Sequence, residues 1–270
     1  MSGLTDTHCH IHAAKPTRDD FTAKKWQEAN ETDPDALINS AIEAGVDRLI
    51  CVGTDLEDSL DAVDFVQTRD NCRATIGTHP HEAKEFLSKH KDLSAFEELA
   101  GKPKVAAIGE VGLDYYYEHS PKKEQIKLLE MFLQLATDRK LPVIFHIREA
   151  FDDFWPIVSN FGAVGGVLHS YTSDTQNLDE ALNKGLYIGL NGIMTFTRDE
   201  NQLKMAKRVP LDRLVVETDA PYLTPKPLRG KVCKPQHVRL TAEFLSELRG
   251  EPYEKFAEAT SNNAGRLFNL

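Results

Sequence analysis

A chain of 270 residues with 41% hydrophobic and 27% charged residues has the composition of an ordinary globular protein and the length of one (β/α)8 barrel. Its formal charge of −10 argues against binding of long duplex DNA by counterion release alone, although metal ions would reverse the local sign in a site. The four cysteines form no CxxC pair, and no apolar run reaches 18 residues. We therefore expect one cytoplasmic domain over residues 1–270, without disulfides, membrane spans or a signal peptide.

Short apolar runs alternate along the chain with segments of helical periodicity. The runs lie at residues 4–10, 48–53, 73–79, 105–110, 142–146, 166–169, 186–189 and 214–217. The helices between them are expected to begin at four signals: Asp33-Pro34, a Thr54-x-x-Glu57 capping box, Ser120-Pro121 and Ser173-x-x-Gln176. Two further helices are expected near residues 235–249 and 252–268, and residues 13–31 as a long loop or a short irregular helix.

Continuous apolar strands joined by helices are typical of parallel sheets that are covered on both faces. Eight such strands in one chain favour a closed barrel over an open doubly wound sheet. We therefore predict the α/β class and a (β/α)8 TIM barrel in a single domain.

Ionisable side chains stand where these runs end. His8 and His10 alternate at the end of the first run, so they share one face of a strand. A His-x-His pair alone is a weak signal of a metal site, but other runs also end in possible ligands, namely Glu110, His146, His169, Glu217 and Asp219. Because the carboxyl ends of barrel strands open into one mouth, we expect these side chains to meet there.

So many nitrogen and oxygen ligands suit two metal ions with a carboxylate between them. Glu110 follows Gly109 and lies close to Gly112, where the backbone can approach closely, and we predict that it bridges the ions. Asp219 is predicted to bind metal and to accept a proton from the attacking water. A mixed set of histidines and carboxylates does not choose among Zn, Mn, Fe and Mg.

Five ordered segments resemble the signatures of the TatD family of metal-dependent hydrolases, from the first strand to the last helix. They are Asp6-Thr-His-Cys-His10, Gly77-Thr-His-Pro-His81, Gly109-Glu-Val-Gly-Leu-Asp-Tyr115, Glu217-Thr-Asp-Ala-Pro-Tyr-Leu-Thr-Pro225 and Thr260-x5-Arg266-Leu-Phe268. The resemblance implies an amidohydrolase-type barrel, a binuclear metal site, and deoxyribonuclease activity that is often exonucleolytic from a 3′ end. The resemblance also implies six metal ligands: His8, His10, Glu110, His146, His169 and Asp219. The positions of these six residues at the ends of the apolar runs predict the same set.

Further residues near these strand ends are predicted to contact substrate. His79 and His81 resemble the family's GxHPH segment and could contact a phosphate or hold a loop. Arg148 could bind a phosphate in bidentate fashion or form a salt bridge at the rim. Tyr115 could stack on a base or pack internally. Glu217 is predicted to position the metal ligands without binding the ions itself.

The loop after the Pro-Tyr-Leu-Thr-Pro segment departs from the family pattern. Relatives commonly carry an Arg-Asn-x-Pro-like segment there, whereas this chain reads Arg229-Gly-Lys231-Val232-Cys233-Lys234-Pro235. Residues 220–242 contain no acidic residue but several basic ones: Lys226, Arg229, Lys231, Lys234 and Arg239. We predict a loop that attracts phosphate, with Arg229 as a substrate contact; an ordinary solvated loop is the alternative.

These observations predict a hydrolase that cleaves phosphodiester bonds in DNA, either single-stranded or at DNA ends, with two divalent ions (Mg, Zn or Mn) that activate water. Asp219 and Glu110 are its predicted catalytic residues. The alternative is a metal-dependent esterase or amidohydrolase, such as a D-aminoacyl-tRNA deacylase. A non-catalytic scaffold would lack ligands, and none of the six is missing. No membrane and no obligate protein partner is predicted.

Overall fold

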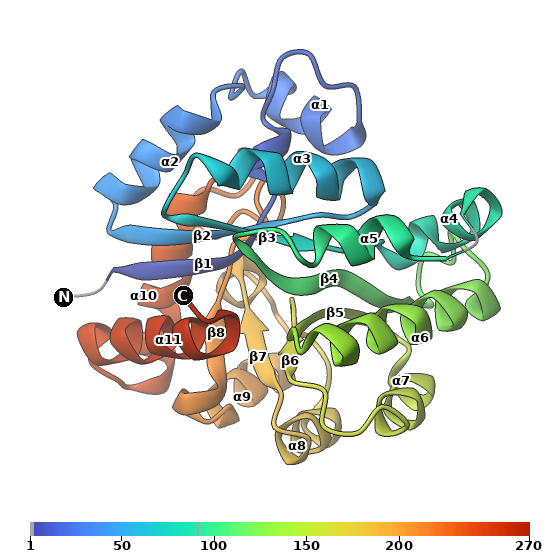
Figure 1. The fold of residues 1–270 in the computed structure, drawn as a ribbon. Coiled ribbons are helices and arrows are strands. Elements are labelled where there is room, and N and C mark those ends of the chain that lie inside the picture. The colour runs from blue at the N-terminus through green and yellow to red at the C-terminus, as the bar shows by residue number, and fades with distance from the viewer. Residues whose placement is uncertain (1–2, 91) are drawn as a thin grey trace. The chain divides into compact units, whose positions relative to one another are not determined.

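The computed structural model describes residues 3–90 and 92–270 (Figure 1). Over these residues eight strands alternate with helices and follow one another through the sheet in chain order, from β1 to β8. The strand pairs with a defined register are all parallel. These features confirm the predicted α/β class and the predicted alternation of eight strands with helices. Contacts between residues group the chain into two compact units, which are described in turn.

Unit 1 covers the described residues up to 51, together with residues 170–183 and 187–270. Its strands are β1 (Leu4–Cys9), β2 (Val46–Val52, except the last residue), β7 (Tyr187–Leu190) and β8 (Leu214–Val216). Its helices are α1 (Phe21–Glu28), α2 (Pro34–Glu43), α8 (Thr175–Asn183), α9 (Glu200–Arg208), α10 (Val238–Arg249) and α11 (Tyr253–Phe268). Short 3-10 turns are η1 (Ile11–Ala13), η3 (Gly192–Thr195), η4 (Leu211–Arg213) and η5 (Pro235–His237).

The ends of β1 and β8 lie side by side in unit 1. Helix α11 packs on both strands (Figure 1) and buries Phe256 and Ala264. Beyond the end of β8, the backbone N–H of Asp219 donates to the carbonyl of His8 at 2.8 Å. This pairing places a carboxylate that follows β8 beside the histidines that end β1.

Unit 2 covers the described residues from 52 to 169 and residues 184–186. Its strands are β3 (Cys72–Ile76), β4 (Val105–Asp114), β5 (Val143–Arg148) and β6 (Gly166–Leu168). Its helices are α3 (Leu56–Gln67), α4 (Ala83–Lys89), α5 (Ser94–Leu99), α6 (Lys122–Arg139) and α7 (Phe151–Ser159), with a 3-10 turn η2 (Pro80–Glu82) before α4.

Strand β4 extends to Asp114, four residues beyond its predicted end at Glu110. In the register of β4 on β5, Gly112 pairs with His146. Glu110 and His146, two predicted metal ligands, therefore belong to neighbouring strands. Helix α6 fixes the end of β4 through Gln125, which is fully buried. The side chain of Gln125 accepts from the Asp114 N–H at 2.7 Å and donates to the Asp114 carbonyl at 3.0 Å.

Two of the predicted helix starts are wrong by one residue. The N-cap of α3 is Asp55, whose side chain accepts from the Asp58 N–H at 2.7 Å, and not Thr54, which donates to the Asp58 carboxylate instead. Helix α8 likewise starts after Asp174, which accepts a backbone N–H three residues on, and not after Ser173. Aspartate caps helices as well as serine and threonine do, so a capping-box pattern beside an Asp is ambiguous.

Other sequence predictions can also be compared with the structure. The predicted Asp33 cap is confirmed, because Asp33 accepts from the N–H groups of Asp35 and Ala36 at the start of α2. Residues 13–31 contain the regular helix α1, capped by Asp20. All four cysteines are buried free thiols. In the part of the chain that the structure describes, no helix is long and apolar enough to cross a membrane. The single domain over residues 1–270 stays a prediction.

Candidate metal centre

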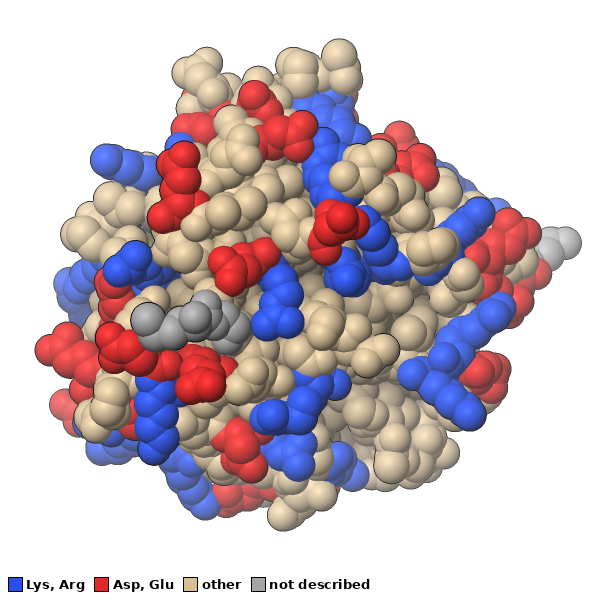
Figure 2. Space-filling model, turned by 60° about the vertical axis from the view of Figure 1, so that its left-hand side comes forward, with Lys and Arg blue, Asp and Glu red and all other residues tan. Residues whose placement is uncertain are grey.

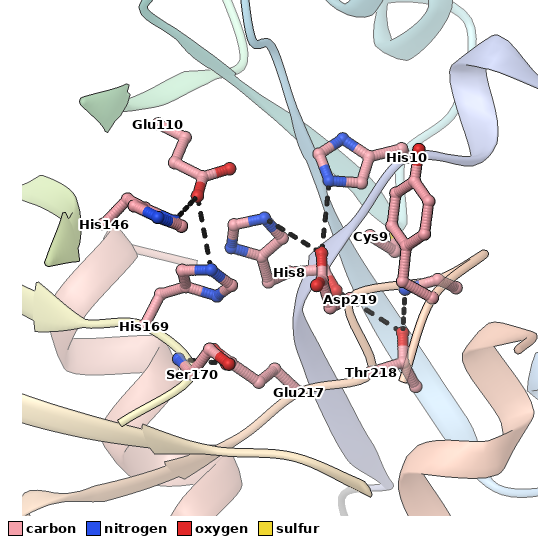
Figure 3. Close-up of polar contacts among 12 residues, drawn as sticks. His8, Cys9, His10, Glu110, His146, His169, Ser170, Glu217, Thr218 and Asp219 are labelled. Atoms are coloured by element: carbon pink, nitrogen blue, oxygen red, sulfur yellow. Dashed lines mark hydrogen bonds and ion pairs between the residues drawn. The ribbon is translucent and has the colours of Figure 1, made fainter. Parts of the chain in front are cut away.

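The first group of possible ligands lies in unit 1 at the ends of β1 and β8 and consists of His8, His10 and Asp219. The Asp219 Oδ1 atom lies 3.7 Å from Nε2 of His8 and 3.4 Å from Nε2 of His10 (Figure 3). His8 is fully buried, whereas the Asp219 side chain keeps 17% of its surface exposed. The predicted alternation of the two histidines thus brings both rings onto one carboxylate.

Asp6 and Thr218 hold the Asp219 loop against β1. The buried Asp6 carboxylate accepts from the Thr218 N–H at 2.8 Å and from the Thr218 hydroxyl at 2.6 Å. Burial raises the pKa of Asp6 to about 8, and these hydrogen bonds only partly offset that rise. Asp219 itself has a φ of +62°, a left-handed conformation that Asp tolerates better than most residues. The fixed Thr218 therefore determines where the next side chain points.

Glu217 is buried in unit 1, with 1% of its surface exposed. Its Oε1 atom accepts from the Ser170 N–H at 2.6 Å (Figure 3), and Asn191 Nδ2 lies 3.5 Å from the same oxygen. Close packing leaves no room for a Cβ at Gly189, which would lie 2.5 Å from Glu217 Oε2. Glu217 thus fixes the backbone that directly follows His169 in the sequence, and the role predicted for it, positioning ligands, stays a prediction.

The second group lies in unit 2 around Glu110. The Glu110 Oε1 atom is 2.8 Å from Nδ1 of His146 and 3.2 Å from Nε2 of His169 (Figure 3). His79 is more distant, with its Nε2 at 3.8 Å from the same oxygen. The closest atoms therefore come from three neighbouring strands: Glu110 from the middle of β4, His146 from near the carboxyl end of β5, and His169 from directly after β6.

His79 differs from the other histidines around Glu110 because its Nδ1 accepts the backbone N–H of His81 at 3.2 Å. A neutral imidazole that accepts at Nδ1 carries its proton on Nε2, the atom that faces Glu110. Burial and the charge of His146 lower the pKa of His79 well below 6.5, which keeps it neutral. His79 therefore presents an N–H donor, which suits contact with an anion better than it suits metal binding.

Asp114 is a fully buried carboxylate that holds two of these rings. Its Oδ2 atom accepts from Nε2 of His146 at 3.2 Å and from Nε2 of His81 at 3.0 Å. Its Oδ1 atom accepts the backbone N–H groups of Tyr116 and Tyr117. His146 donates through Nε2 to Asp114, and its Nδ1 faces Glu110 Oε1 at 2.8 Å, so Nδ1 becomes a ligand atom once a metal ion replaces its proton. Asp114 thus orients the ring of His146, a predicted metal ligand.

The carboxylates of unit 2 also set the charge state of these rings. Burial alone would raise the pKa of Asp114, but the hydrogen bonds from His146, His81 and the Tyr117 N–H outweigh it, so that pKa is lowered. Burial lowers the pKa of His146, but its hydrogen bonds to Asp114 and Glu110 outweigh this effect and raise it. Asp114 is therefore ionised, as an acceptor of two ring N–H groups must be.

Both groups fit the donor set and spacing of a divalent ion. Nitrogen and oxygen ligands at about 2.0–2.2 Å in tetrahedral geometry lie roughly 3.3 Å from one another. In unit 1 the two nitrogen–oxygen separations are 3.4 and 3.7 Å, and in unit 2 the two closest are 2.8 and 3.2 Å. In unit 1, His8, His10 and Asp219 have the mutual spacing of ligands to one ion. In unit 2, Glu110 has that spacing with His79 and His146, and His169 Nε2 also lies 3.2 Å from Glu110 Oε1.

The glycines near Glu110 permit the close strand contact that builds the second group. A Cβ at Gly112 would lie 1.9 Å from the carbonyl oxygen of His146, and Gly112 has a φ of +156°. A Cβ at Gly77 would lie 2.8 Å from the Glu110 carbonyl. Only glycine allows β4 to approach its neighbours in this way, as the sequence led us to expect.

Tyr115, Arg148 and Arg229, which are also predicted to contact substrate, each contact other groups of the protein. Tyr115 donates its hydroxyl to Asp153 at 2.7 Å. The Arg148 guanidinium lies over the ring of Tyr116, 4.1 Å from its centroid. Arg229 lies over the ring of Phe196 at 3.8 Å and donates to the Thr224 carbonyl at 3.0 Å. The substrate contacts of these residues stay predictions.

Figure 2 shows how charge is distributed on one face of the molecule. On this face the Lys and Arg side chains are interspersed with Asp and Glu side chains, and neither sign forms one continuous patch. The net charge of −10 is therefore not gathered on this face as an acidic surface that would repel a phosphate chain.

The sequence model of the TatD-related DNase family matches residues 5–269. The chain belongs to this family. It is a metal-dependent hydrolase that acts on ester bonds, as predicted. The family membership agrees with the His and carboxylate groups described above, since both provide ligands for divalent ions.

Named relatives cover almost the whole chain. An uncharacterised metal-dependent hydrolase of Bacillus subtilis, YabD, is 35% identical over 99% of both chains. The 3′-5′ ssDNA/RNA exonuclease TatD of Citrobacter rodentium is 34% identical over 88% of this chain and 92% of its own. The crystal structure of YjjV, a TatD homologue from Escherichia coli K12, matches with a TM-score of 0.85 at 28% identity, covering 99% of this chain and 98% of the other. This match confirms the predicted (β/α)8 fold class.

Some residues of the two groups were not among the predicted site residues. Asp6 and Asp114 both lie within the quoted motifs, but neither is among the predicted site residues, although Asp6 alternates in phase with His8 and His10, and Asp114 with Glu110. Thr218, which lies between Glu217 and Asp219, is also not among the predicted site residues. A signal was present in each case, since a short polar side chain in an otherwise apolar strand needs a hydrogen-bonding partner when it is buried.

Proposed function

We propose that this protein is a metal-dependent deoxyribonuclease that removes nucleotides from the 3′ end of single-stranded DNA. The observation that carries the proposal is the presence of two His/carboxylate groups, each with the ligand spacing of one divalent ion. The exonuclease activity named for the Citrobacter relative supports the choice of substrate and direction.

In this proposal two ions take part, each held by one group. His8, His10 and Asp219 bind one ion, and Glu110, His146 and His169 bind the other. Glu110 would be the ligand shared between the ions, since a carboxylate has two oxygens with which to bind. Mg, Mn and Zn all suit this donor set.

When bound, two divalent ions lower the pKa of a coordinated water to near 7 and polarise the phosphoryl group. Asp219 accepts the proton of the attacking water and returns a proton to the leaving oxygen. Its side chain is 17% exposed while His8 is buried, so Asp219 is the more accessible of these two to water. The His79 Nε2–H donates to a phosphate oxygen, for which its neutral state and its orientation suit it.

The test is a nuclease assay on a 5′-labelled single-stranded 20-mer. The protein is stripped with chelator and then supplied with Mg, Mn or Zn one at a time. Digestion from the 3′ end gives a ladder of shortened labelled products, whereas digestion from the 5′ end releases the label as a mononucleotide at once. If none of the metals restores cleavage of the strand, the proposal is wrong.

A D-aminoacyl-tRNA assayed in parallel tests the esterase alternative. Hydrolysis of its ester without cleavage of the 20-mer would assign the same metal groups to acyl transfer instead. Cleavage of the 20-mer with an intact aminoacyl ester supports the nuclease proposal.

A further inference from the structure

Helix α1 is anchored to the strand end that carries His10. The buried Trp26 donates its indole N–H to the His10 carbonyl at 3.1 Å. Asp20 caps the helix by accepting the Ala23 N–H at 2.8 Å. Gln27 donates to the Arg18 carbonyl at 2.8 Å and so ties the preceding loop to the same helix. The first turn of α1 is therefore held at a fixed place beside a predicted metal ligand.

Phe21, at the start of this helix, exposes 69% of its surface and lies next to Tyr222. The two rings are nearly parallel, at 11°, with centroids 6.2 Å apart. The Thr22 and Tyr222 hydroxyls are hydrogen-bonded at 2.9 Å, and the Tyr222 ring meets the His10 ring edge-on at 6.3 Å. Phe21 and Tyr222, called here the aromatic platform, thus lead outward from His10 to solvent.

A cavity of about 690 Å³ in unit 1 is lined by Lys25, which follows Phe21 by one helical turn, and by Pro221, which precedes Tyr222 in the sequence. We call it the lysine pocket; its lining includes Lys25, Pro221, Lys231, Lys234, Gln236 and His237. Its size lies within the range of roughly 300–1,000 Å³ that small-molecule sites occupy. Lys25 joins the two features, because its Nζ lies 5.5 Å from the centroid of the Phe21 ring.

The lysine pocket has a surplus of positive charge. Lys25 pairs with Glu28 at 3.2 Å, and Lys234 pairs with Glu31, which also lines the pocket. Among the residues that the structure describes, Lys231 pairs with no carboxylate, although its backbone is fixed by hydrogen bonds at both its N–H and its carbonyl. An anionic ligand would neutralise this charge.

A second observation in the pocket also points to a ligand. Within the described part of the chain, the side-chain Oε1 atom of Gln236 is buried without a hydrogen-bond partner. Buried amide groups are rarely left unsatisfied, and a bound group with an N–H or O–H donor, such as the amino group of a nucleobase, would complete this one.

We propose that the aromatic platform and the lysine pocket bind successive nucleotides of a single strand, with a nucleobase stacked on Phe21 and a backbone phosphate at Lys231. Exposed aromatic rings beside a cationic groove are the combination that single-stranded nucleic acid requires, because only an unpaired base offers its face for stacking. The inference rests on the proposed function, and it names the residues that hold the strand beside the His8, His10 and Asp219 group.

Binding is tested without cleavage, by fluorescence anisotropy of a labelled single-stranded octamer on full-length protein in the presence of chelator. Phe21→Ala should weaken binding at least about 5-fold, the lower range for loss of one base stack. Phe21→Trp should restore it, and Leu60→Ala, which truncates an exposed side chain of unit 2, should leave it unchanged. On an abasic octamer the wild type and Phe21→Ala should bind equally.

Lys231→Gln tests the phosphate contact in the same assay. The slope of log affinity against log salt should become shallower by about 0.7, the value for one phosphate contact on a single strand. Lys123→Gln, on helix α6 of unit 2, is the matched control and should leave the slope unchanged.

The outcomes separate this inference from the proposed function. Equal octamer binding by wild type, Phe21→Ala and Lys231→Gln overturns the inference, even if the protein cleaves DNA. Weaker binding by both variants supports the inference, and absence of cleavage in that case would count against the proposed function alone. A wild type that does not bind the octamer overturns the inference as well.

Discussion

The Asp114 carboxylate accepts the Nε2–H of His146 at 3.2 Å, and this contact determines which nitrogen of His146 faces Glu110. The two residues lie on neighbouring strands, and Asp114 is fully buried. A ligand histidine whose other nitrogen donates to a carboxylate has its tautomer and orientation fixed. The contact therefore keeps Nδ1 directed at the Glu110 group, where a metal ion can replace the Nδ1 proton.

Asp114→Asn should lower metal affinity about 10- to 100-fold. The amide would present its NH2 group to the ring, so Nε2 of His146 would become an acceptor and Nδ1 would carry the proton that blocks metal binding. The affinity is measured by competition with a chromophoric chelator. Activity should return at high metal concentration, which a misfolded variant would not show. Unchanged affinity would mean that Asp114 does not act through His146.

Asp219→Asn should lower the rate of DNA cleavage by about 100- to 10,000-fold, the range for loss of a general base. The amide keeps the shape of the carboxylate but accepts no proton, and the backbone contact of Asp219 with His8 is unaffected. Thermal unfolding should stay within a few degrees of the wild type. Full activity in a variant that retains its metal content would exclude Asp219 as the base.

His10→Ala and Glu110→Gln should each reduce the metal content, because each removes a ligand of a different group. Elemental analysis of the wild type is expected to give two ions per chain. His10→Ala should retain the ion at Glu110, whereas Glu110→Gln should lower the occupancy of both ions, and more strongly that of the ion near His146, because Glu110 is the proposed shared ligand. If His10→Ala has the same ion content as the wild type, the unit 1 group does not bind metal.

The stability of the fold should fall in mild acid because of His237. Burial and the charges of Lys234 and Lys231 lower the pKa of His237 to about 4, and its Nδ1 accepts the Lys234 N–H. Between pH 6.5 and about 4 the unfolded chain binds a proton that the folded chain does not, so the free energy of unfolding decreases as the pH falls. One proton limits the slope to about 1.4 kcal/mol per pH unit, and the partial exposure of the ring reduces it further.

Urea unfolding of the wild type and of His237→Gln at pH 7, 6, 5 and 4 isolates this contribution. All other titrating groups are common to both proteins, so the difference between their free energies of unfolding reports His237. That difference should change with pH below 6.5 and be constant above it. A constant difference across the whole range would show that His237 does not carry the effect.

The sequence predicted the strands well because strands depend on local patterns, and the metal-ligand roles, which come from the same patterns, stay predictions. His8 and His10 follow from strand alternation, and Glu110, His146 and His169 each end an apolar run. The hydrogen-bond partners of Asp6 and Asp114 could not be predicted from such local patterns. Asp6 meets Thr218 more than 200 residues away, and Asp114 meets His81 and His146 through the registers of three strands. Such contacts depend on how the strands are aligned, which a local pattern does not specify.

The aromatic platform shows the same limit. Residues 13–31 have mixed charge and no clear period, so the sequence predicts either a long loop or a short irregular helix where Phe21 lies. Trp26 decides its position, because its indole reaches the His10 carbonyl across the 3-10 turn η1. The helix is therefore stabilised by one long-range contact and a cap more than by a continuous apolar stripe.

Gly112→Ala should destabilise the protein by about 3 kcal/mol or more. The added Cβ would lie 1.9 Å from the His146 carbonyl, and the backbone at φ +156° disfavours a side chain. Gly162→Ala is the control, since Gly162 has a φ of +73° but no atom within 4 Å of the new Cβ, and should cost about 1–2 kcal/mol. Free energies of unfolding from urea titrations compare the two variants.

Gly112→Ala should also lower metal-dependent activity because it displaces His146, whereas Gly162→Ala should not. Equal effects of the two substitutions on stability would show that β4 can move away from β5 without loss.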